Sequence, residues 1–150
     1  MEKVVEIQHF LPHRKPMLMV DYIMAMDREN VVTTFSVKAD NVFADDGRFT
    51  EPGLIENAAQ TCSAIVAKSY FVNDDDTVQS KDVIGFISSI KKVIIHSLPK
   101  IGCEIITKAQ LVSRFDTGEF ITCMMSCKSY CDGDLLLEGD INLFIREAGK

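Results

Sequence analysis

The feature that most constrains the fold is the stretch from Glu51 to Tyr70, which has the pattern of one long helix. No charged residue lies between Glu56 and Lys68, where the polar positions hold only amides and hydroxyls. Apolar residues recur at helical spacing, namely Leu54, Ile55, Ala58, Ala59, Cys62, Ile65, Val66 and Tyr70. Because a helix this small and uncharged has no ordinary solvated face, we expect a sheet to cover most of its sides.

Glu56 is the exceptional residue of this helix, because it is a single carboxylate in the first turns of an element that should be largely buried. A carboxyl group held partly out of water at such a place is a candidate general acid or base. The alternative is that Glu56 stabilises the helix N-terminus from a solvated position, where negative charge is favourable. The helix pattern supports both interpretations equally.

The overall composition is that of a soluble globular protein, with 150 residues, 47% hydrophobic and 25% charged. We therefore expect residues 1–150 to form one domain. No apolar run approaches the length of a membrane span, and the N-terminus has no signal-peptide core, which predicts a cytoplasmic protein. The net charge of −6 disfavours binding to nucleic acid.

The spacing of the cysteines and the absence of common catalytic motifs exclude several classes of site. There is no Cys-x-x-Cys pair, so we predict no metal site and reduced thiols at Cys62, Cys103, Cys123, Cys127 and Cys131. The sequence also lacks a Gly-x-Gly-x-x-Gly loop, a P-loop and a Gly-x-Ser-x-Gly elbow. These absences remove the commonest nucleotide-binding and serine-hydrolase functions.

Most of the remaining elements are strands, separated by turns and loops. Residues 3–10 could form a short helix, residues 11–16 a proline-fixed loop, and residues 38–50 a polar loop. Strands are predicted at 17–26, 31–37, 83–95, 103–112, 120–130 and 135–145. Two strands, one long helix and four further strands predict an α+β fold, with the helix packed on a curled antiparallel sheet.

Three segments resemble the (3R)-hydroxyacyl-[acyl-carrier-protein] dehydratases of type II fatty-acid synthesis. They are LPHRKPMLMVD at 11–21, PG at 52–53 followed by ENAAQ at 56–60, and LPKIG at 98–102. The shortened motifs are also similar to a diverged branch linked to aryl-polyene or flexirubin-type pigments. The resemblance implies a single hotdog domain, a curled antiparallel sheet around one long central helix. It also implies homodimers joined edge to edge, in some members assembled as trimers of dimers.

The resemblance also implies a mechanism. In that family a Glu at the start of the helix, matched here by Glu56, helps the β-hydroxyl of the substrate to leave as water. A His from an earlier segment removes the α-proton, and backbone N–H groups at the helix start polarise the thioester carbonyl. The implied substrate contacts are Gly53, Leu54, Gln60, Phe49 and Phe86. No metal and no organic cofactor are implied.

The sequence departs from the family where the catalytic base should be, because Arg48 stands at the position of the family's His. An arginine cannot act as a base at neutral pH. Among the three histidines, His9 belongs to the expected short helix and His96 ends a strand. His13, in the rigid loop near the acyl channel of the family, is the best substitute base. The alternative is that His13 and Arg14 only bind loop carbonyls.

Three functions are compatible with these residues. The first is dehydration of 3-hydroxyacyl-carrier-protein thioesters to trans-2-enoyl thioesters, in fatty-acid or polyene-type biosynthesis. The second is an acyl thioesterase of the same fold, in which Glu56 activates water or attacks directly. The third is a non-catalytic acyl-binding subunit that pairs with an active paralogue, which would explain the missing His.

Basic residues near the expected site entrance suggest a partner. They could dock an acidic acyl carrier protein, since complementary charge speeds encounter. They could equally be ordinary solvated side chains. The residues are Arg14, Lys15, Lys91, Lys92 and Lys100.

Overall fold

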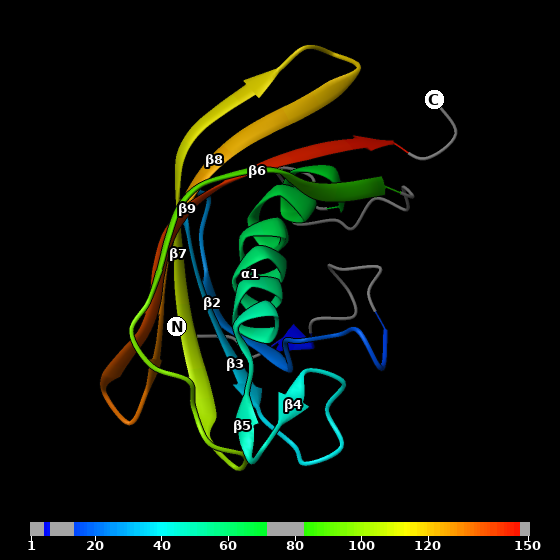
Figure 1. Cartoon of the computed structure of the whole chain (residues 1–150). Helices are drawn as coiled ribbons and strands as arrows, with labels where there is room; N and C mark the ends of the chain where they lie inside the picture. Colours follow the sequence, from blue (N-terminus) through cyan, green and yellow to red (C-terminus); the bar gives the residue numbers. More distant parts are fainter. Residues whose placement is uncertain (1–4, 7–13, 72–82, 148–150) are drawn as a thin grey trace.

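The computed structural model describes residues 5–6, 14–71 and 83–147. A 7-stranded antiparallel sheet, in the order β1-β2-β3-β7-β8-β9-β6, curves round α1 (Glu51–Phe71), as Figure 1 shows. The strands are β1 (Val5–Glu6), β2 (Tyr22–Met26), β3 (Asn30–Ser36), β6 (Val83–Ile95), β7 (Glu104–Asp116), β8 (Phe120–Cys131) and β9 (Asp134–Glu147). The predicted α+β hotdog architecture is confirmed. In this part of the chain no helix has the length and hydropathy of a membrane span.

The N-terminal third differs most from the sequence-based expectation. The predicted strand at 17–26 begins only at Tyr22, because Met19 is bound by helix side chains instead of a strand. The Met19 N–H donates to Gln60 Oε1 at 2.7 Å, and Asn57 Nδ2 donates to the Met19 carbonyl at 2.7 Å. The predicted helix at 3–10 is wrong at residues 5–6, which pair with β2, and its other residues lie outside the described ranges.

The expected loop at 38–50 contains a small hairpin of β4 (Ala44–Asp45) and β5 (Arg48–Phe49). Its turn is Asp46-Gly47, and both residues have positive φ, at 50° and 77°. Positive φ at both central residues is typical of the two-residue turns that match strand twist, for which Asp-Gly is a preferred sequence. The hairpin leads directly into α1, so it fixes where the helix begins.

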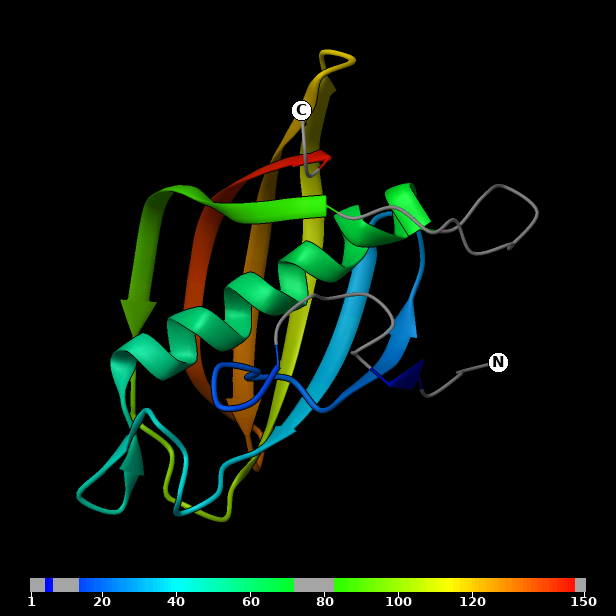
Figure 2. The same cartoon turned by 90° about the vertical axis from the view of Figure 1, so that its right-hand side faces the viewer.

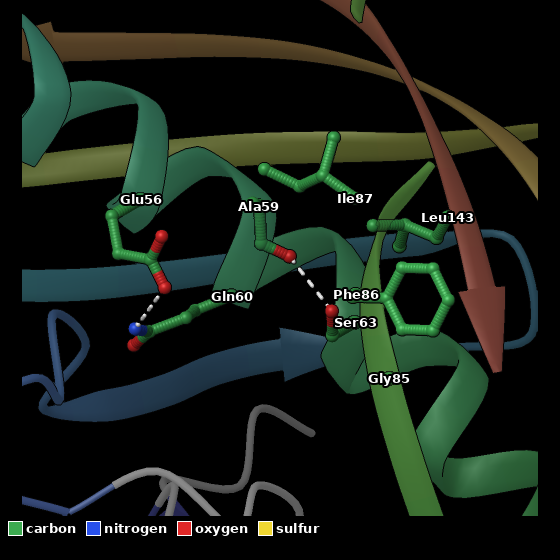
Figure 3. A pocket seen from close by; sticks show the side chains of 8 residues that line it. All are labelled: Glu56, Ala59, Gln60, Ser63, Gly85, Phe86, Ile87 and Leu143. Carbon is green, nitrogen blue, oxygen red and sulfur yellow. Dashed lines mark hydrogen bonds between the residues drawn. The ribbon is translucent and has the colours of Figure 1, made fainter. Parts of the chain in front are cut away.

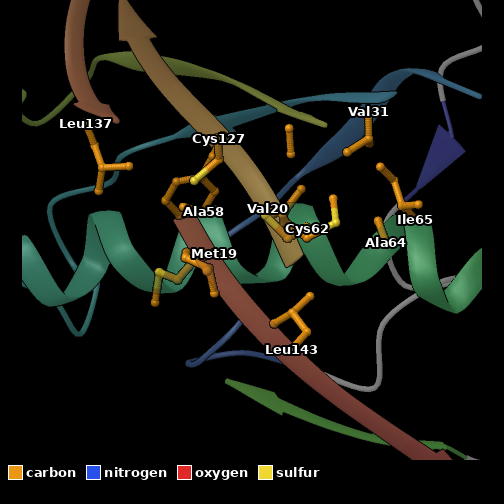
Figure 4. Close-up of a cluster of buried hydrophobic side chains, with 14 of the residues drawn as sticks. Met19, Val20, Val31, Ala58, Cys62, Ala64, Ile65, Cys127, Leu137 and Leu143 are labelled. Atoms are coloured by element: carbon orange, nitrogen blue, oxygen red, sulfur yellow. The ribbon is translucent and has the colours of Figure 1, made fainter. Parts of the chain in front are cut away.

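Both faces of α1 are buried, which explains why its sequence lacks charge. Ala58, Cys62 and Ile65 pack into the hydrophobic core between the helix and the sheet (Figure 4). The polar face is buried too, and its groups are hydrogen-bonded: Thr107 Oγ1 donates to Asn57 Oδ1 at 2.6 Å. Figure 2 shows β6, an edge strand of the same curved sheet, running alongside the helix. Buried polar groups are tolerated only when they are paired in this way.

The prediction of reduced thiols is wrong for Cys103 and Cys131, which form a disulfide. Antiparallel pairing of β7 with β8 brings the start of one strand beside the end of the other, with 6.5 Å between the two Cα atoms. The other three cysteines are free and buried. Burial raises the pKa of Cys123 to about 11. A hydrogen bond between the thiols of Cys62 and Cys127 raises the pKa of Cys62 and lowers that of Cys127.

Candidate active site

A pocket of about 190 Å³ lies between α1 and the two strands β6 and β9 (Figure 3). One wall is the helix face and the other is the edge strand with its neighbour, where Ile87 pairs with Leu143. The lining residues are Glu56, Ala59, Gln60, Ser63, Gly85, Phe86, Ile87 and Leu143. A concave site of this kind, with few polar groups among apolar ones, is the usual form of a small-molecule site.

The pocket is polar at one end and apolar at the other (Figure 3). The carboxylate of Glu56 and the amide of Gln60 lie together at the polar end, whereas Phe86, Ile87 and Leu143 lie at the apolar end. Phe86 is 50% exposed and stacks on Phe144, with 5.0 Å between ring centroids. This polarity suits a ligand with a polar reacting group and an apolar tail.

Glu56 is partly buried, and its carboxylate is held by the next turn of its own helix. Its Oε1 accepts a hydrogen bond of 2.9 Å from Gln60 Nε2, four residues later. Residues four apart lie on the same helix face, so the helix itself places the two groups together. This position beside a pocket agrees with the interpretation of Glu56 as an acid or base, which stays a prediction.

Three of the expected substrate contacts lie outside this lining. Gly53 and Leu54 are buried in the first turn of α1, and Phe49 is buried in β5, just before the helix. A Cβ on Gly53 would come within 2.5 Å of the Phe49 ring, so this glycine serves close packing. The Leu54 N–H donates to the Thr50 carbonyl at 3.1 Å and is therefore already used by the helix. Their roles toward substrate stay predictions.

Among the residues that the structure describes, no histidine lines the pocket. His13 and His9 lie outside the described residues, so the expectation of His13 as a base is not tested. His96 follows directly after β6, and its Nε2 lies 3.8 Å from Glu138 Oε1. Arg48 at the position of the family's base donates from Nη1 to the Leu98 carbonyl at 2.7 Å, so its guanidinium holds the turn before β7.

The proposed docking residues are all on the surface. They are Arg14, Lys15, Lys91, Lys92 and Lys100, and each side chain is exposed. Exposure agrees with docking of an acidic partner and equally with simple solvation.

Sequence reasoning found Glu56, Gln60 and Phe86 but missed other residues of the lining. Ser63 could have been found, because it lies seven residues after Glu56 and so shares its helix face. Ile87 and Leu143 could not, because they meet only through the register of β6 with β9. Gly85 pairs regularly with Ile145 and lines the pocket, whereas the register shifts come later in β6.

Comparisons with known proteins identify the family. Residues 5–148 match the model of the ApeP-like family, described as ApeP dehydratase. A 3-hydroxyacyl-[acyl-carrier-protein] dehydratase FabZ from Sinorhizobium medicae is 31% identical over 140 residues, which cover 79% of this chain and 88% of that protein. The FabZ of Rhizobium rhizogenes is 36% identical over 99 residues, which cover 54% of this chain and only 60% of that protein.

A solved structure shows the same fold. It is the dehydratase heterocomplex ApeI:P from Xenorhabdus doucetiae, with a TM-score of 0.78 and 18% identity over 97% of this chain and 93% of that chain. At this identity the likeness establishes the fold alone. With the family match spanning nearly the whole sequence, the chain belongs to the ApeP-like family of dehydratases.

Proposed function

We propose that this chain removes water from 3-hydroxyacyl thioesters to give trans-2-enoyl thioesters. The observation that carries the proposal is the carboxylate of Glu56 at the polar end of a pocket whose other end is apolar. The curated relatives are dehydratases for substrates of this kind, which supports the assignment. The substrate would be held on an acyl carrier protein, and the pathway would be fatty-acid or polyene-type biosynthesis in the cytoplasm.

The reaction needs one acid and one base. Glu56 in its acid form donates its proton to the β-hydroxyl as the Cβ–O bond breaks, and water leaves. A base takes the α-proton, and the electron pair of that C–H bond becomes the second bond between Cα and Cβ. The thioester carbonyl makes the α-proton acidic by taking up charge in the transition state. His13 is the base that we propose within the chain, four residues before Met17, whose carbonyl is bound by Gln60.

The pocket size limits what lies inside it. At about 30 Å³ for each water-sized group, 190 Å³ holds roughly six non-hydrogen atoms. That is enough for the thioester group, the α- and β-carbons and the hydroxyl. A longer acyl chain would have to extend past Phe86, whose ring is half exposed at the rim.

We also propose a homodimer joined through β6. This strand is an edge of the described sheet, and its side chains from 85 to 92 are nearly all exposed, including Phe86 and Ile90. An exposed edge strand of this length is a ready template for pairing with another chain. A strand paired with β6 would close the open side of the pocket, because Phe86 and Ile87 line the pocket and also belong to this edge strand. A trimer of such dimers is the larger assembly to be tested.

A second candidate function is that of a subunit whose partner supplies the base. The specific observation is Arg48, which stands where the family has its His and is engaged with the Leu98 carbonyl. The structural neighbour from Xenorhabdus doucetiae is described as a dehydratase heterocomplex. In this arrangement Glu56 would serve a site completed by a paralogue across the β6 edge.

The test is an absorbance assay with a 3-hydroxyacyl pantetheine thioester, for wild type and for Glu56→Gln. Enoyl formation by wild type, lost in the variant, supports the dehydratase. Release of free thiol without enoyl formation would instead indicate a thioesterase. Absence of both activities in the isolated chain, and their appearance when a dehydratase paralogue is added, would support the subunit function.

A further inference from the structure

The hairpin of β7 and β8 extends past the neighbouring strand β3. Pairing of β3 with β7 ends at Gln110, and the Leu111 N–H then donates to the Glu29 carbonyl at 2.7 Å. β7 continues to Asp116, and Figure 2 shows the hairpin rising above the other strands. Among the described residues, no strand pairs with β7 beyond this point on the side of β3. Residues 112–116 therefore form an open edge, which we call the arm.

The arm carries the two most exposed large hydrophobic side chains among the described residues. Phe115 is 66% exposed and Val112 is 58% exposed. An open strand edge with exposed apolar side chains is a ready site for pairing with another chain, and proteins often protect such an edge with lysine or proline. The arm has the sequence VSRFD, with neither lysine nor proline. Its two charged residues, Arg114 and Asp116, decide which partner fits.

The backbone of the arm faces outward at two defined residues. In an antiparallel strand, successive residues direct their N–H and C=O groups to opposite sides. The Thr117 N–H donates to the Phe120 carbonyl at 3.0 Å, so Thr117 faces β8, and so does Phe115 two residues earlier. Arg114 and Asp116 therefore direct their backbone groups to the open edge. The register shift at the start of the arm turns these two residues outward, because it changes which residues face β8.

The charges of the arm fit a second copy of the same arm in one register. Two arms that pair antiparallel about a twofold axis must match outward-facing residues with each other. With Arg114 of one copy opposite Asp116 of the other, two pairs of opposite charge form. Sliding one arm by two residues in either direction places Arg114 opposite Arg114 or Asp116 opposite Asp116, which is unfavourable. We propose that the arm docks against the arm of a second copy of this chain, with Phe115 facing Phe115 across the twofold axis.

This register also covers the exposed side chains. The two Phe115 residues form a non-hydrogen-bonded pair, the kind in which facing side chains lie closest. Alternate side chains of a strand point to opposite faces, so the charged pairs lie on the other face. Arg114 Nη2 and Asp116 Oδ2 are already 3.7 Å apart within one chain, with side chains 38% and 48% exposed. Pairing of two arms therefore brings together four charges of alternating sign, and a network of charges stabilises more than a single surface pair.

Pairing through the arm leaves the contact proposed at β6 free. β6 is one edge of the sheet, whereas the open edge of the arm is on the side of β3. Both surfaces can therefore be occupied in one assembly. Pairing of the arms depends neither on the proposed dehydratase activity nor on the β6 contact.

Sedimentation velocity of the full chain tests the pairing by charge reversal. Asp116→Arg places arginines opposite each other, and Arg114→Asp places aspartates opposite each other, so each variant alone should have at most half the wild-type mass. A mixture of the two variants presents only opposite charges, so it should form assemblies at least twice the mass of either variant. Glu104→Arg makes the same change of charge at the other end of β7. It is the matched control and should keep the wild-type mass.

A cysteine at the twofold axis reads the register directly. In the proposed pair the two Cα atoms of residue 115 lie about 4.5 Å apart, within the range of a disulfide. Phe115→Cys should therefore give a covalent dimer on oxidation, whereas Ser113→Cys, which faces Thr117 of the other copy, should not.

Three results would overturn the inference: a monomeric wild type or an unchanged mass for Asp116→Arg, a mixture that stays dissociated, or no covalent dimer from Phe115→Cys. Dimers that remain in both charge variants of a larger wild-type assembly would be joined at the contact proposed for β6. Monomers in both variants would refute that contact and leave the pairing of the arms supported.

Discussion

Substituting Gly53 by alanine tests how tightly the start of α1 is packed. A Cβ at this position would lie 2.5 Å from Cε1 and Cζ of Phe49 and 2.9 Å from the Cβ of Phe43. Phe49 has no exposed surface, and its ring packs against Phe35 with 5.8 Å between centroids. The phenylalanine ring cannot simply swing into solvent, so either the ring or the helix start must move.

Two effects of opposite sign decide the outcome. Alanine stabilises a helix relative to glycine by up to about 1 kcal/mol. Overpacking a well-filled core costs about 1–3 kcal/mol. Because the clash involves a buried ring, we expect the second effect to prevail and the free energy of unfolding to fall by about 1–2 kcal/mol. For a chain of this size that corresponds to a melting temperature lower by roughly 2–8 °C.

Urea unfolding of the full chain measures this change. The midpoint should fall for Gly53→Ala at an unchanged slope, and Ser63→Ala on the same helix should not lower it. Adding Phe49→Leu makes room for the new methyl group, so the double variant should lose less stability than the two single losses added together. A Gly53→Ala protein that is as stable as wild type, or more stable, would refute the packing described for the helix start.

Two further predictions concern the cysteines. Cys131→Ser, or reduction of wild type, should lower the free energy of unfolding by about 3–4 kcal/mol, because the disulfide closes a loop with a sequence separation of 28. A urea midpoint unaffected by reductant would show that the bond is not formed. Burial raises the pKa of Cys123 from 9.0 to about 11, so its thiol should stay protonated and resist iodoacetamide at pH 8 until the protein unfolds. In the unfolded chain this thiol loses its proton at a lower pH than in the folded protein, so the free energy of unfolding should also fall as pH rises from about 9 to 11. Rapid labelling of Cys123 in the native protein, seen by mass spectrometry, would contradict the expected protection.

The fold could be predicted largely because its elements obey simple periods. The uncharged helix and the β-branched strands can each be recognised from the residues of that element alone. The absence of charge in α1 already indicated that other elements cover the helix on most sides. The segment at 17–21 could not be placed, because an apolar run looks like a strand even when helix amides such as Asn57 and Gln60 bind its backbone.

The candidate site was only half visible in the sequence, for a physical reason. Glu56 and Gln60 lie on one helix turn, so spacing alone brings them together. The opposite wall depends on which residue of β6 faces which residue of β9, and a shift by one residue would replace Leu143 by a residue pointing to the other face. The disulfide depends on strand pairing in the same way, since Cys103 and Cys131 come together only when β7 lies beside β8.

The central claim is that Glu56 gives a proton to the departing hydroxyl of a bound 3-hydroxyacyl thioester. The most direct measurement uses a pantetheine thioester labelled with ¹⁸O at the 3-hydroxyl and follows the products by mass spectrometry. The account predicts that wild type releases the label as water and leaves the thioester bond intact, while Glu56→Gln releases none above background. Label retained in the acyl product, or release by Glu56→Gln at the wild-type rate, would contradict it.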